Sequence, residues 1–539
     1  MGRSHHNEGQ LNLAEKCYRQ VLALDPNNVD GLHLLGVIAF QSNHCEEGIR
    51  LIKLAALKKP NDPAILVNLG AAYRKAERSA EARDAYKAAL KLKPDLWEAY
   101  FNLGKALLDL EDCDGAIKVY QKCIAIKPAD PEAYVNLGNA YKSKGEGDSA
   151  IAAYEQALRL SGTMTQAYGN IAAVFFDRGW LLAALAVMDK AIAIDPRPGE
   201  LRFKRSLMTL RLAQFSVGWG DYESRYFGET ERIPRPSAPP PYWAGEDLSG
   251  KNILLGTEQG LGDEILYGSM IPDIMARAGR CVIRCSVRMV PVFARSFPEA
   301  VVLPYPSQDV HPALQISIDY QIGIPSLGQF LRPDLAHFPA HQGYLKADSH
   351  RTEALRERYK AVMPGNLIVG LSWRSKNDRI GKSKSAEISD WAEILRVPGV
   401  TFVNLQYGDC ADELAAVQQA LGITIIQDHE IDPLKNMDDF FAQVAAMDLV
   451  VTTSNTSVHV AGSLNVPAWL LLSTGLASLW YWFLSGEECP WYPSVRIFRR
   501  PSGAVVGAGP WWHDVVERAG QGLALWVKNR VSRVQTRPS

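Results

Sequence analysis

Small and hydrophobic residues recur with a fixed period along the first two fifths of the chain. Leucine–glycine pairs follow one another in steps of 34 residues, at 35–36, 69–70, 103–104 and 137–138. Residues 171–172 (Ile-Ala) continue the series, and Ala82, Tyr86 and Pro94 belong to further columns with the same step. Small residues let two helices approach closely, and the proline ends the second helix of each unit. The pattern therefore predicts a solenoid of paired helices.

The 34-residue period and its residue types are those of the tetratricopeptide repeat (TPR). We predict a TPR solenoid over residues 1–198 that begins in mid-repeat, so that either a longer natural array precedes it or the first ten residues form a cap. Residues 200–226 resemble a degenerate last helix pair, and 233–241 are rich in proline. We therefore assign 199–245 to a capping helix pair and a linker.

The period changes after Lys251, where short β-branched or apolar runs alternate with longer helical patterns. Such alternation is typical of parallel sheets built from β-α-β units. The predicted strands are 253–255, 282–284, 301–303, 367–371, 402–405, 424–426, 449–452 and 468–472. They form two α/β domains, at 246–346 and 347–500, followed by a helical tail at 501–539.

Composition and charge exclude several classes of protein. The 539 residues are 47% hydrophobic and 22% charged, as in ordinary soluble globular proteins, and they are too many for one domain. The formal charge of -1 gives no overall field that would attract nucleic acid or acidic lipid. The apolar runs are shorter than a membrane span, and no signal peptide opens the chain, so we expect a cytoplasmic protein. The eight cysteines are scattered, as expected for reduced, packed thiols.

The loop after the first predicted strand is one candidate site. Gly260 and Gly262 would allow close backbone approach at a helix N-terminus, which favours anions. Asp263 then becomes a possible general base. The alternative is a tight strand-to-helix turn in which Asp263 or Glu264 serves the helix dipole.

A second candidate follows the predicted strand at 449–452. Asn455, Thr456 and Ser457 offer an amide, hydroxyls and free backbone N–H groups where a helix begins, and this combination suits a diphosphate. A plain N-cap needs only one such side chain. His459 belongs to the same segment, although it is equally explained as a packed, hydrogen-bonded core histidine.

Two further strand ends carry polar residues. Arg374 could clamp a phosphate oxygen, and the alternative is a solvated side chain. Gln406 and Tyr407 could hold a base or ribose, and the alternative is a plain turn. No metal-binding motif or Walker loop occurs in the sequence, so we expect no metal and no cofactor. Ile265 stands where a dinucleotide fingerprint would have its third glycine, which disfavours an oxidoreductase.

Taken together, these segments resemble bacterial TPR glycosyltransferases whose C-terminal half has the two-Rossmann GT-B fold of the lipopolysaccharide heptosyltransferase family. The segments that carry the resemblance are 243–251, 258–263, 370–374, 405–408, 455–462 and 490–493. The resemblance implies that the first α/β domain binds the acceptor and the second the nucleotide-sugar. It covers nearly the whole chain.

The resemblance also implies roles for individual residues. Asp263 would deprotonate the acceptor hydroxyl, Arg374 would pair with the donor phosphate, and Thr456 and Ser457 would bind the diphosphate, without a metal. This chain has Asn455 where heptosyltransferases usually have an Asp.

The same architecture is similar to that of the eukaryotic O-linked N-acetylglucosamine transferase, whose solenoid presents protein substrates, so the expected acceptor is a protein. The competing hypothesis is a non-catalytic TPR scaffold with a degenerate nucleotide-sugar domain, and Asn455 is the residue that favours it.

Overall fold

The computed structural model describes residues 1–195, 197–227, 240–305, 317–375, 381–472, 479–499 and 512–535. The chain divides into two compact units, Met1–Pro196 and Arg197–Ser539. Most of the proline-rich segment at 233–241 and residues 501–511 lie outside the described ranges.

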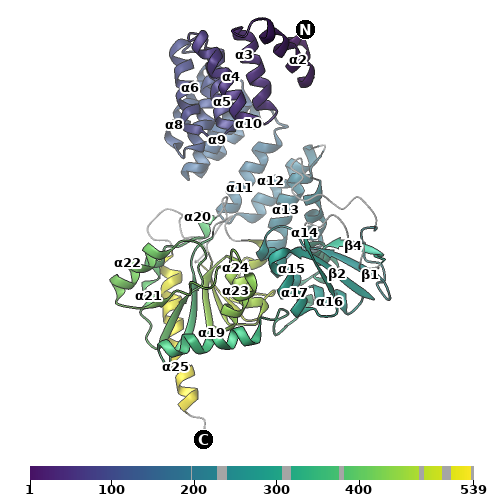
Figure 1. Ribbon diagram of the computed structural model, residues 1–539, viewed down its shortest axis with the longest axis vertical. Helices are drawn as coiled ribbons and strands as arrows, with labels where there is room; N and C mark the ends of the chain where they lie inside the picture. Colours follow the sequence, from purple (N-terminus) through teal and green to yellow (C-terminus); the bar gives the residue numbers. More distant parts are fainter. Residues whose placement is uncertain are drawn as a thin grey trace. The chain divides into compact units, whose positions relative to one another are not determined.

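The first unit is built from helices that pack in consecutive pairs (Figure 1). They are α1 (Gly2–Asn7), α2 (Leu11–Leu24), α3 (Val29–Gln41), α4 (Cys45–Lys58), α5 (Pro63–Lys75), α6 (Ser79–Leu92), α7 (Trp97–Asp109), α8 (Cys113–Ile126), α9 (Pro131–Lys144), α10 (Gly147–Leu160), α11 (Thr165–Asp177) and α12 (Leu181–Ile194). The helical solenoid predicted from the period is therefore confirmed.

The repeated glycine and tyrosine explain how each pair closes. A Cβ atom on Gly70 would lie 2.5 Å from the ring of Tyr86, and one on Gly138 would lie 2.5 Å from the ring of Tyr154. Each tyrosine thus packs on the glycine of its own repeat, where a larger residue would push the two helices apart. The alanines of the same columns are buried, as Ala82 and Ala150 are.

The second unit begins with a helix pair, α13 (Gly199–Arg211) and α14 (Phe215–Tyr222), and the short 3-10 helix η1 (Glu223–Tyr226). Trp219 and Tyr222 belong to the same buried cluster as Ile253 and Leu255 of the first sheet. The pair predicted to cap the repeats is therefore part of the core of the second unit.

Two parallel sheets form the framework of the second unit. The strands are β1 (Asn252–Gly256), β2 (Arg280–Ser286), β3 (Val301–Tyr305), β4 (Tyr320–Gly323), β5 (Leu367–Ser372), β6 (Val400–Asn404), β7 (Ile425–Ile426), β8 (Leu449–Thr453), β9 (Ala468–Leu472) and β10 (Val495–Arg499). The first sheet has the order β3-β2-β1-β4 and the second has the order β10-β9-β8-β5-β6-β7. Neighbouring strands pair in parallel throughout, for example Leu254 opposite Val282 and Val369 opposite Leu449.

Each of the eight predicted strands overlaps an observed one, so the parallel α/β prediction is confirmed. The sequence pattern missed β4 and β10. Both lie at the edge of a sheet, and each has an isolated bridge on its outer side, Tyr242 with Gln321 and Glu488 with Arg496. Gln321 in β4 and Arg496 in β10 interrupt the apolar runs that identified the other strands.

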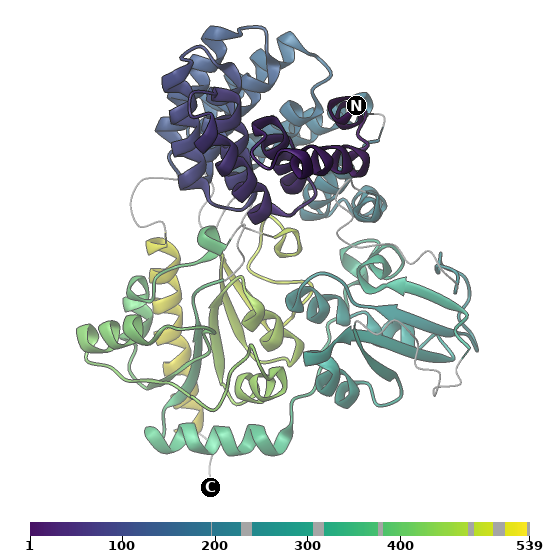
Figure 2. The same ribbon diagram turned by 45° about the horizontal axis from the view of Figure 1, so that its top comes forward.

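Helices cover both sheets, and Figure 2 shows several of them between the two sheets. The helices of this region are α15 (Leu261–Gly268), α16 (Ile271–Met275), η2 (Val287–Met289), α17 (Val290–Ser296), η4 (Ile324–Leu327), α18 (Gly328–Leu331), η5 (Leu335–His337), α19 (Ser349–Val362), α20 (Gly381–Lys384), η6 (Ile388–Trp391), α21 (Ala392–Leu395), α22 (Ala411–Leu421), α23 (Met437–Ala445), α24 (Thr456–Ser463), η8 (Trp480–Trp482) and α25 (His513–Gln535). α15 packs on α24 and α17 on α23, and one buried cluster runs from the first sheet into the second.

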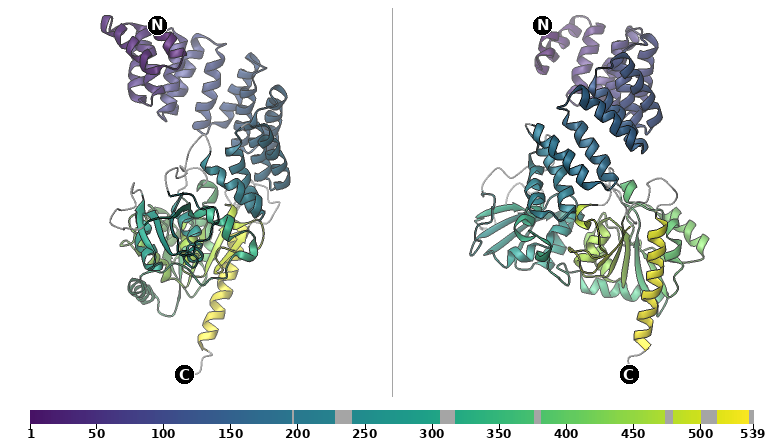
Figure 3. Two further views of the ribbon diagram at one scale, coloured as in Figure 1. Left: turned by 90° about the vertical axis from the view of Figure 1, so that its right-hand side faces the viewer. Right: turned by 180° about the vertical axis from the view of Figure 1, so that it is seen from behind.

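The last helix, α25, lies along the second sheet (Figure 3, yellow). Val516, Ala519 and Leu523 are buried in a cluster that also contains Trp469 and Phe498 of that sheet. The first half of the helix expected in 501–539 is thus part of a core. Among the described helices, none is both long enough and apolar enough to span a membrane.

Candidate functional site

Two of the predicted loops meet where β1 and β8 end. β1 leads through residues 257–260 into α15, and β8 leads through Ser454 and Asn455 into α24. A Cβ atom on Gly262 would lie 3.1 Å from Cδ2 of His459, so the missing side chain lets the two helices begin close together. The carboxyl ends of parallel strands are where ligands of open α/β sheets bind.

Asp263, the candidate base, is half-buried in the first turn of α15. Its Oδ2 atom lies 3.4 Å from the amide nitrogen of Gly260. Burial raises the pKa of Asp263 to about 6, while the Gly260 N–H and the charge of Lys384 act in the opposite direction. The carboxylate meets the helix terminus, as the alternative interpretation expected, and it also has the near-neutral pKa that a general base needs.

Glu264, the other acidic residue of this turn, has a structural position. Its buried carboxylate accepts hydrogen bonds from the backbone N–H of Ser286 at 3.3 Å and from the Ser286 hydroxyl at 3.1 Å. Glu264 therefore ties α15 to the end of β2.

Lys384 was not identified from the sequence. It is the last residue of α20 and is 4% exposed. Burial lowers the pKa of its ammonium to about 8, and the charge of Asp263 acts in the opposite direction. Between pH 6 and pH 8 both groups are therefore charged. A single lysine beyond the strand-end motif gave no signal in the sequence, because only the fold brings it near Asp263.

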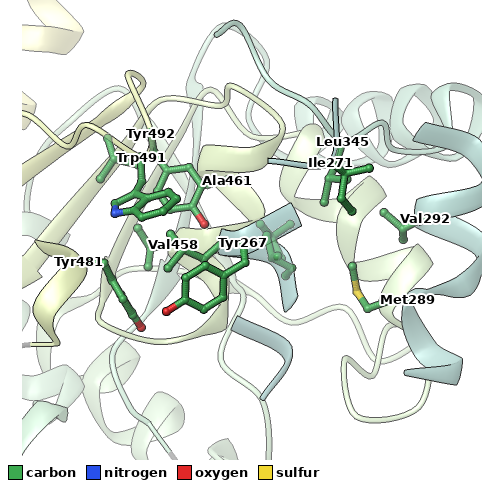
Figure 4. Packing of buried hydrophobic residues seen from close by; sticks show 14 of the residues in the cluster. Tyr267, Ile271, Met289, Val292, Leu345, Val458, Ala461, Tyr481, Trp491 and Tyr492 are labelled. Atoms are coloured by element: carbon green, nitrogen blue, oxygen red, sulfur yellow. The ribbon is translucent and has the colours of Figure 1, made fainter. Parts of the chain in front are cut away.

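Three buried tyrosines, Tyr222, Tyr267 and Tyr481, are close enough to Asp263 to be influenced by its charge. The hydroxyls of Tyr222 and Tyr267 are 3.1 Å apart, and Gln259 donates from Nε2 to the Tyr222 hydroxyl at 2.9 Å. Burial raises the pKa of Tyr222 to about 12, and the Asp263 charge adds to the upward shifts of Tyr222, Tyr267 and Tyr481. Figure 4 shows Tyr267 and Tyr481 near one another and beside the aromatic residues of the 491–492 segment. The three hydroxyls remain protonated near neutral pH and can donate hydrogen bonds.

His459 lies inside this aromatic cluster. Its ring stacks on Trp482 with centroids 5.3 Å apart, and Nδ1 is 2.9 Å from the hydroxyl of Tyr492. Burial lowers the pKa of His459 to about 3, so the ring is neutral. This environment matches the alternative of a packed, hydrogen-bonded core histidine.

Asn455 joins the start of α24 to the end of β5. Its Oδ1 accepts from the backbone N–H of Ser457 at 2.9 Å, which makes it the N-cap of α24. Its Nδ2 donates to the Ser372 hydroxyl at 2.8 Å and to the Arg374 carbonyl oxygen at 3.2 Å. A carboxylate could not donate to that carbonyl, so the amide is suited to this junction.

The hydroxyl residues around the start of α24 differ in their surroundings. Thr456 is half-buried, whereas Ser457 is buried. The Oγ of Ser457 and the Oγ1 of Thr453 have no hydrogen-bond partner among the described residues. Buried hydroxyls of this kind are unusual and are available to a ligand that reaches them.

Arg374 follows β5, and Gln406 follows the neighbouring strand β6. The Arg374 guanidinium forms an ion pair with Glu413 at 2.6 Å and donates to the Asp409 carbonyl oxygen at 3.0 Å. The Oε1 of Gln406 accepts from the backbone N–H groups of Trp373 at 3.0 Å and Arg374 at 2.8 Å. Both predicted site residues therefore have partners within the protein.

A cavity of about 440 Å³ lies at the ends of β6 and β7. Gln406 and Tyr407 line it, together with residues 427–429 and 431–434. Asp428 and Asp432 are also among its lining side chains, and none of the described side chains that line it is a lysine or an arginine. Asn455 and His459 do not line this cavity, so the predicted site residues form two neighbourhoods rather than one. Within the described ranges, no group of three or more His, Cys, Asp or Glu side chains could hold a metal ion.

Comparison with known families identifies the repeats. A TPR repeat model matches residues 70–111 and 104–145, and tetratricopeptide repeat models match 131–163 and 1–28. The chain therefore contains TPR repeats.

One relative extends beyond the repeats. Protein FlbA from Caulobacter vibrioides is 35% identical over 314 residues, a stretch that covers 55% of this chain and 51% of FlbA. The chain thus matches about half the length of this relative.

Solved structures are similar to parts of the chain. The crystal structure of MamA is 29% identical, and the match covers 30% of this chain and 89% of MamA with a TM-score of 0.28. A TPR protein from Parabacteroides merdae is 18% identical over 43% of this chain and 91% of that protein, with a TM-score of 0.38.

Proposed function

We propose that the chain is a metal-independent glycosyltransferase that moves a sugar from a nucleotide-diphosphate donor to an acceptor hydroxyl. The order of the second sheet supports this proposal, because β7-β6-β5-β8-β9-β10 is the order of doubly wound nucleotide-binding sheets. The first sheet has the matching partial order. Two such domains correspond to the GT-B fold that the sequence motifs resemble.

The observation that carries the proposal is the pairing of α15 with α24, with Asp263 near Lys384. In the proposed reaction the acceptor oxygen attacks the anomeric carbon and Asp263 takes its proton. The bond from that carbon to the diphosphate breaks, and the electron pair leaves with the diphosphate. Lys384 and the N-terminus of α24 stabilise the departing negative charge. Tyr222 and Tyr481 donate hydrogen bonds beside the acceptor.

The cavity at β6 and β7 is the proposed nucleoside site. Asp409 and Asp432 in its lining disfavour phosphate but accept hydrogen bonds from the hydroxyls and amines of a nucleoside, whereas Asp428 is already paired with Arg358. Gln406 and Tyr407 line this cavity, and Arg374 is tied to Asp409 on its wall. The donor would thus extend from the acidic cavity to the basic end near Lys384.

The repeats suggest that the acceptor is a protein. TPR solenoids present extended surfaces to protein partners, and the first unit provides such a surface. We therefore propose a protein acceptor, in line with the resemblance to O-linked N-acetylglucosamine transferase.

A non-catalytic scaffold is the second candidate. It is favoured by the internal bonding of Arg374 and Asn455, because both side chains are already paired within the protein. In that case the TPR repeats would recruit partners and the α/β region would not turn over a donor.

Nucleotide-dependent stabilisation distinguishes the two candidates. We expect one nucleoside diphosphate to raise the melting temperature of the full chain, since ligand at 100 times its Kd adds about 2.7 kcal/mol. Lys384→Ala should reduce the shift strongly. The matched surface variant Lys251→Ala should leave it unchanged, because this side chain is 48% exposed and lies at the opposite end of β1 from Asp263. If no nucleoside diphosphate moves the transition, the scaffold is the better account.

A further inference from the structure

A buried cluster of charged and hydroxyl side chains lies next to the candidate site without belonging to it. The Arg225 side chain is 2% exposed and that of Glu258 is 7% exposed. Arg225 donates from Nε to Glu258 Oε2 at 2.9 Å and from Nη2 to the Tyr226 hydroxyl at 2.6 Å. The Tyr226 hydroxyl in turn donates to Glu258 Oε1.

The same guanidinium also reaches the first sheet. Its Nη2 donates to the Ser326 hydroxyl at 2.6 Å, and its Nη1 pairs with Glu223 at 2.8 Å. Ser326 belongs to η4, which follows β4, while Glu258 follows β1. Arg225 therefore joins η1 to the carboxyl ends of two neighbouring strands.

Glu258 is the residue through which the cluster reaches the loop of Asp263. The next residue, Gln259, has φ of +67°, a left-handed conformation that is unfavourable for a residue with a side chain. Its amide is held by the Tyr222 hydroxyl. Gly260 follows. Its carbonyl oxygen accepts hydrogen bonds from the backbone N–H groups of Asp263 at 2.9 Å and of Glu264 at 3.0 Å. The strained Gln259 therefore lies between Glu258, which is held by Arg225, and the turn that leads to Asp263.

A glycine in β4 keeps space free for this cluster. A Cβ atom on Gly323 would overlap the carboxylate of Glu258 and would lie 2.5 Å from the Tyr226 hydroxyl. The end of β4 therefore approaches the ion pair so closely that no side chain fits between them.

Stability alone is a weak reason for such a cluster. Burying an ion pair removes both charges from water, and apolar replacements of similar volume are often equally stable. Strained backbone that the surroundings hold in place is, in contrast, characteristic of functional sites. The cluster spans only a few residues, and it ends directly at the loop that carries Asp263.

We propose that Arg225, Tyr226 and Glu258 are positioning residues that hold the β1–α15 loop so that the carboxylate of Asp263 faces the acceptor. The proposal rests on the proposed function for the role of Asp263, and it gives η1, the short helix after α14, a part in positioning the candidate base. None of the three side chains is required to touch the substrate.

Amide hydrogen exchange of the full chain tests the positioning without any enzymatic assay. In Arg225→Lys the charge remains but the forked set of donors is lost, so we expect the amides of residues 257–264 to exchange at least tenfold faster. The matched control is Arg332→Lys, because Arg332 is 3% exposed and is paired with Asp273 in the same unit. Equal exchange of 257–264 in the two variants would overturn the proposal.

A second pair of variants decides the matter if Arg225→Lys fails to fold. Gly323→Ala pushes directly on Glu258, whereas Gly279→Ala meets the backbone of Gly250 at 2.7 Å, at the opposite end of the same sheet. We expect faster exchange of 257–264 in Gly323→Ala but not in Gly279→Ala. The reverse result, or no difference, would overturn the proposal.

Turnover provides a separate readout. With a donor and acceptor identified, Arg225→Lys should lower kcat at least tenfold and leave the KM for the donor unchanged, and Tyr226→Phe should show a smaller fall of the same kind. A change in donor KM with kcat unchanged would contradict positioning of the base. If the wild-type chain transfers no sugar, the proposed function fails, while the exchange experiment still decides whether the cluster orders the loop.

Discussion

The two compact units are stabilised by different kinds of contact. In the helical unit one contact recurs, a glycine of the first helix against a tyrosine of the second, as in Gly70 with Tyr86 and Gly138 with Tyr154. In the α/β unit the decisive contacts occur once and join distant segments, such as Arg225 with Ser326, which are 101 positions apart. Equivalent contacts therefore recur along the first unit. In the second unit, buried polar groups gather at contacts that each occur once.

This difference indicates where function has shaped the molecule. Repeat proteins gain stability from many equivalent local interfaces. Buried charges, shifted pKa values and strained backbone generally oppose stability and gather at functional sites. In this chain Asp263, Lys384 and Gln259 combine all three features in the α/β unit.

The largest expected effect on stability comes from breaking the buried ion pair of the α/β unit. Arg225→Met leaves the Glu258 carboxylate buried without its partner, which should lower the free energy of unfolding by about 3–5 kcal/mol. Urea unfolding followed by tryptophan fluorescence reports on this unit, because only Trp97 and Trp180 precede residue 197. A loss below 1 kcal/mol would show that this ion pair contributes little to the stability of the α/β unit.

The second effect is a pH dependence that belongs to Asp263. Its pKa is raised to about 6 in the folded chain, above the value near 3.9 expected when unfolded. The protonated carboxyl therefore stabilises the fold at low pH, and this contribution is lost as the pH rises through 6. Relative to Asp263→Asn, wild type should lose about 2–3 kcal/mol between about pH 4 and pH 7. Parallel stability curves for the two proteins would contradict the raised pKa.

A third test addresses the recurring contact of the helical unit. Gly104→Ala places a methyl group against the ring of Tyr120, and overpacking of this kind should cost about 1–3 kcal/mol. The matched control is Gly162→Ala, where the nearest atom would be 3.9 Å away. Amide exchange in α8 should accelerate in the first variant only. Equal exchange in the two variants would show that Tyr120 leaves room for a methyl group at position 104.

The smallest effect is expected for a surface ion pair of the helical unit. Arg74 and Asp109 are 2.6 Å apart, and each side chain is 38% exposed. Arg74→Met should lower the free energy of unfolding by about 0–1 kcal/mol, as measured by amide exchange in α5. A loss as large as that of Arg225→Met would contradict the view that single polar contacts matter more for stability in the α/β unit than in the helical unit.

The fold was predictable to the extent that its signals are local. A 34-residue period or an apolar run is visible in the sequence itself, and the paired helices of the repeats and eight of the strands were predicted on that basis. The strands β4 and β10 were missed because a polar residue interrupts each short apolar run, Gln321 in β4 and Arg496 in β10.

The candidate site was predictable only in part. The loops of Asp263 and Asn455 stood out because each follows an apolar strand, and the fold brings them together through Gly262 and His459. Lys384 and Arg225 gave no signal, because only the fold brings Lys384 near Asp263 and Arg225 to Glu258. Asn455 stands where the resemblance to heptosyltransferases leads us to expect an Asp. Its structural role became apparent only from its hydrogen bonds.

The most direct test of the central claim is release of nucleoside diphosphate from a panel of nucleotide-sugars, with and without candidate protein acceptors. The account predicts that one donor is turned over by the wild-type chain. Asp263→Asn should lower that rate by about 10²–10⁴-fold, the usual contribution of a general base. The matched variant Asp247→Asn, on the surface of the same unit, should retain it. Full activity of Asp263→Asn, or no turnover of any donor by the wild-type chain, would contradict the account.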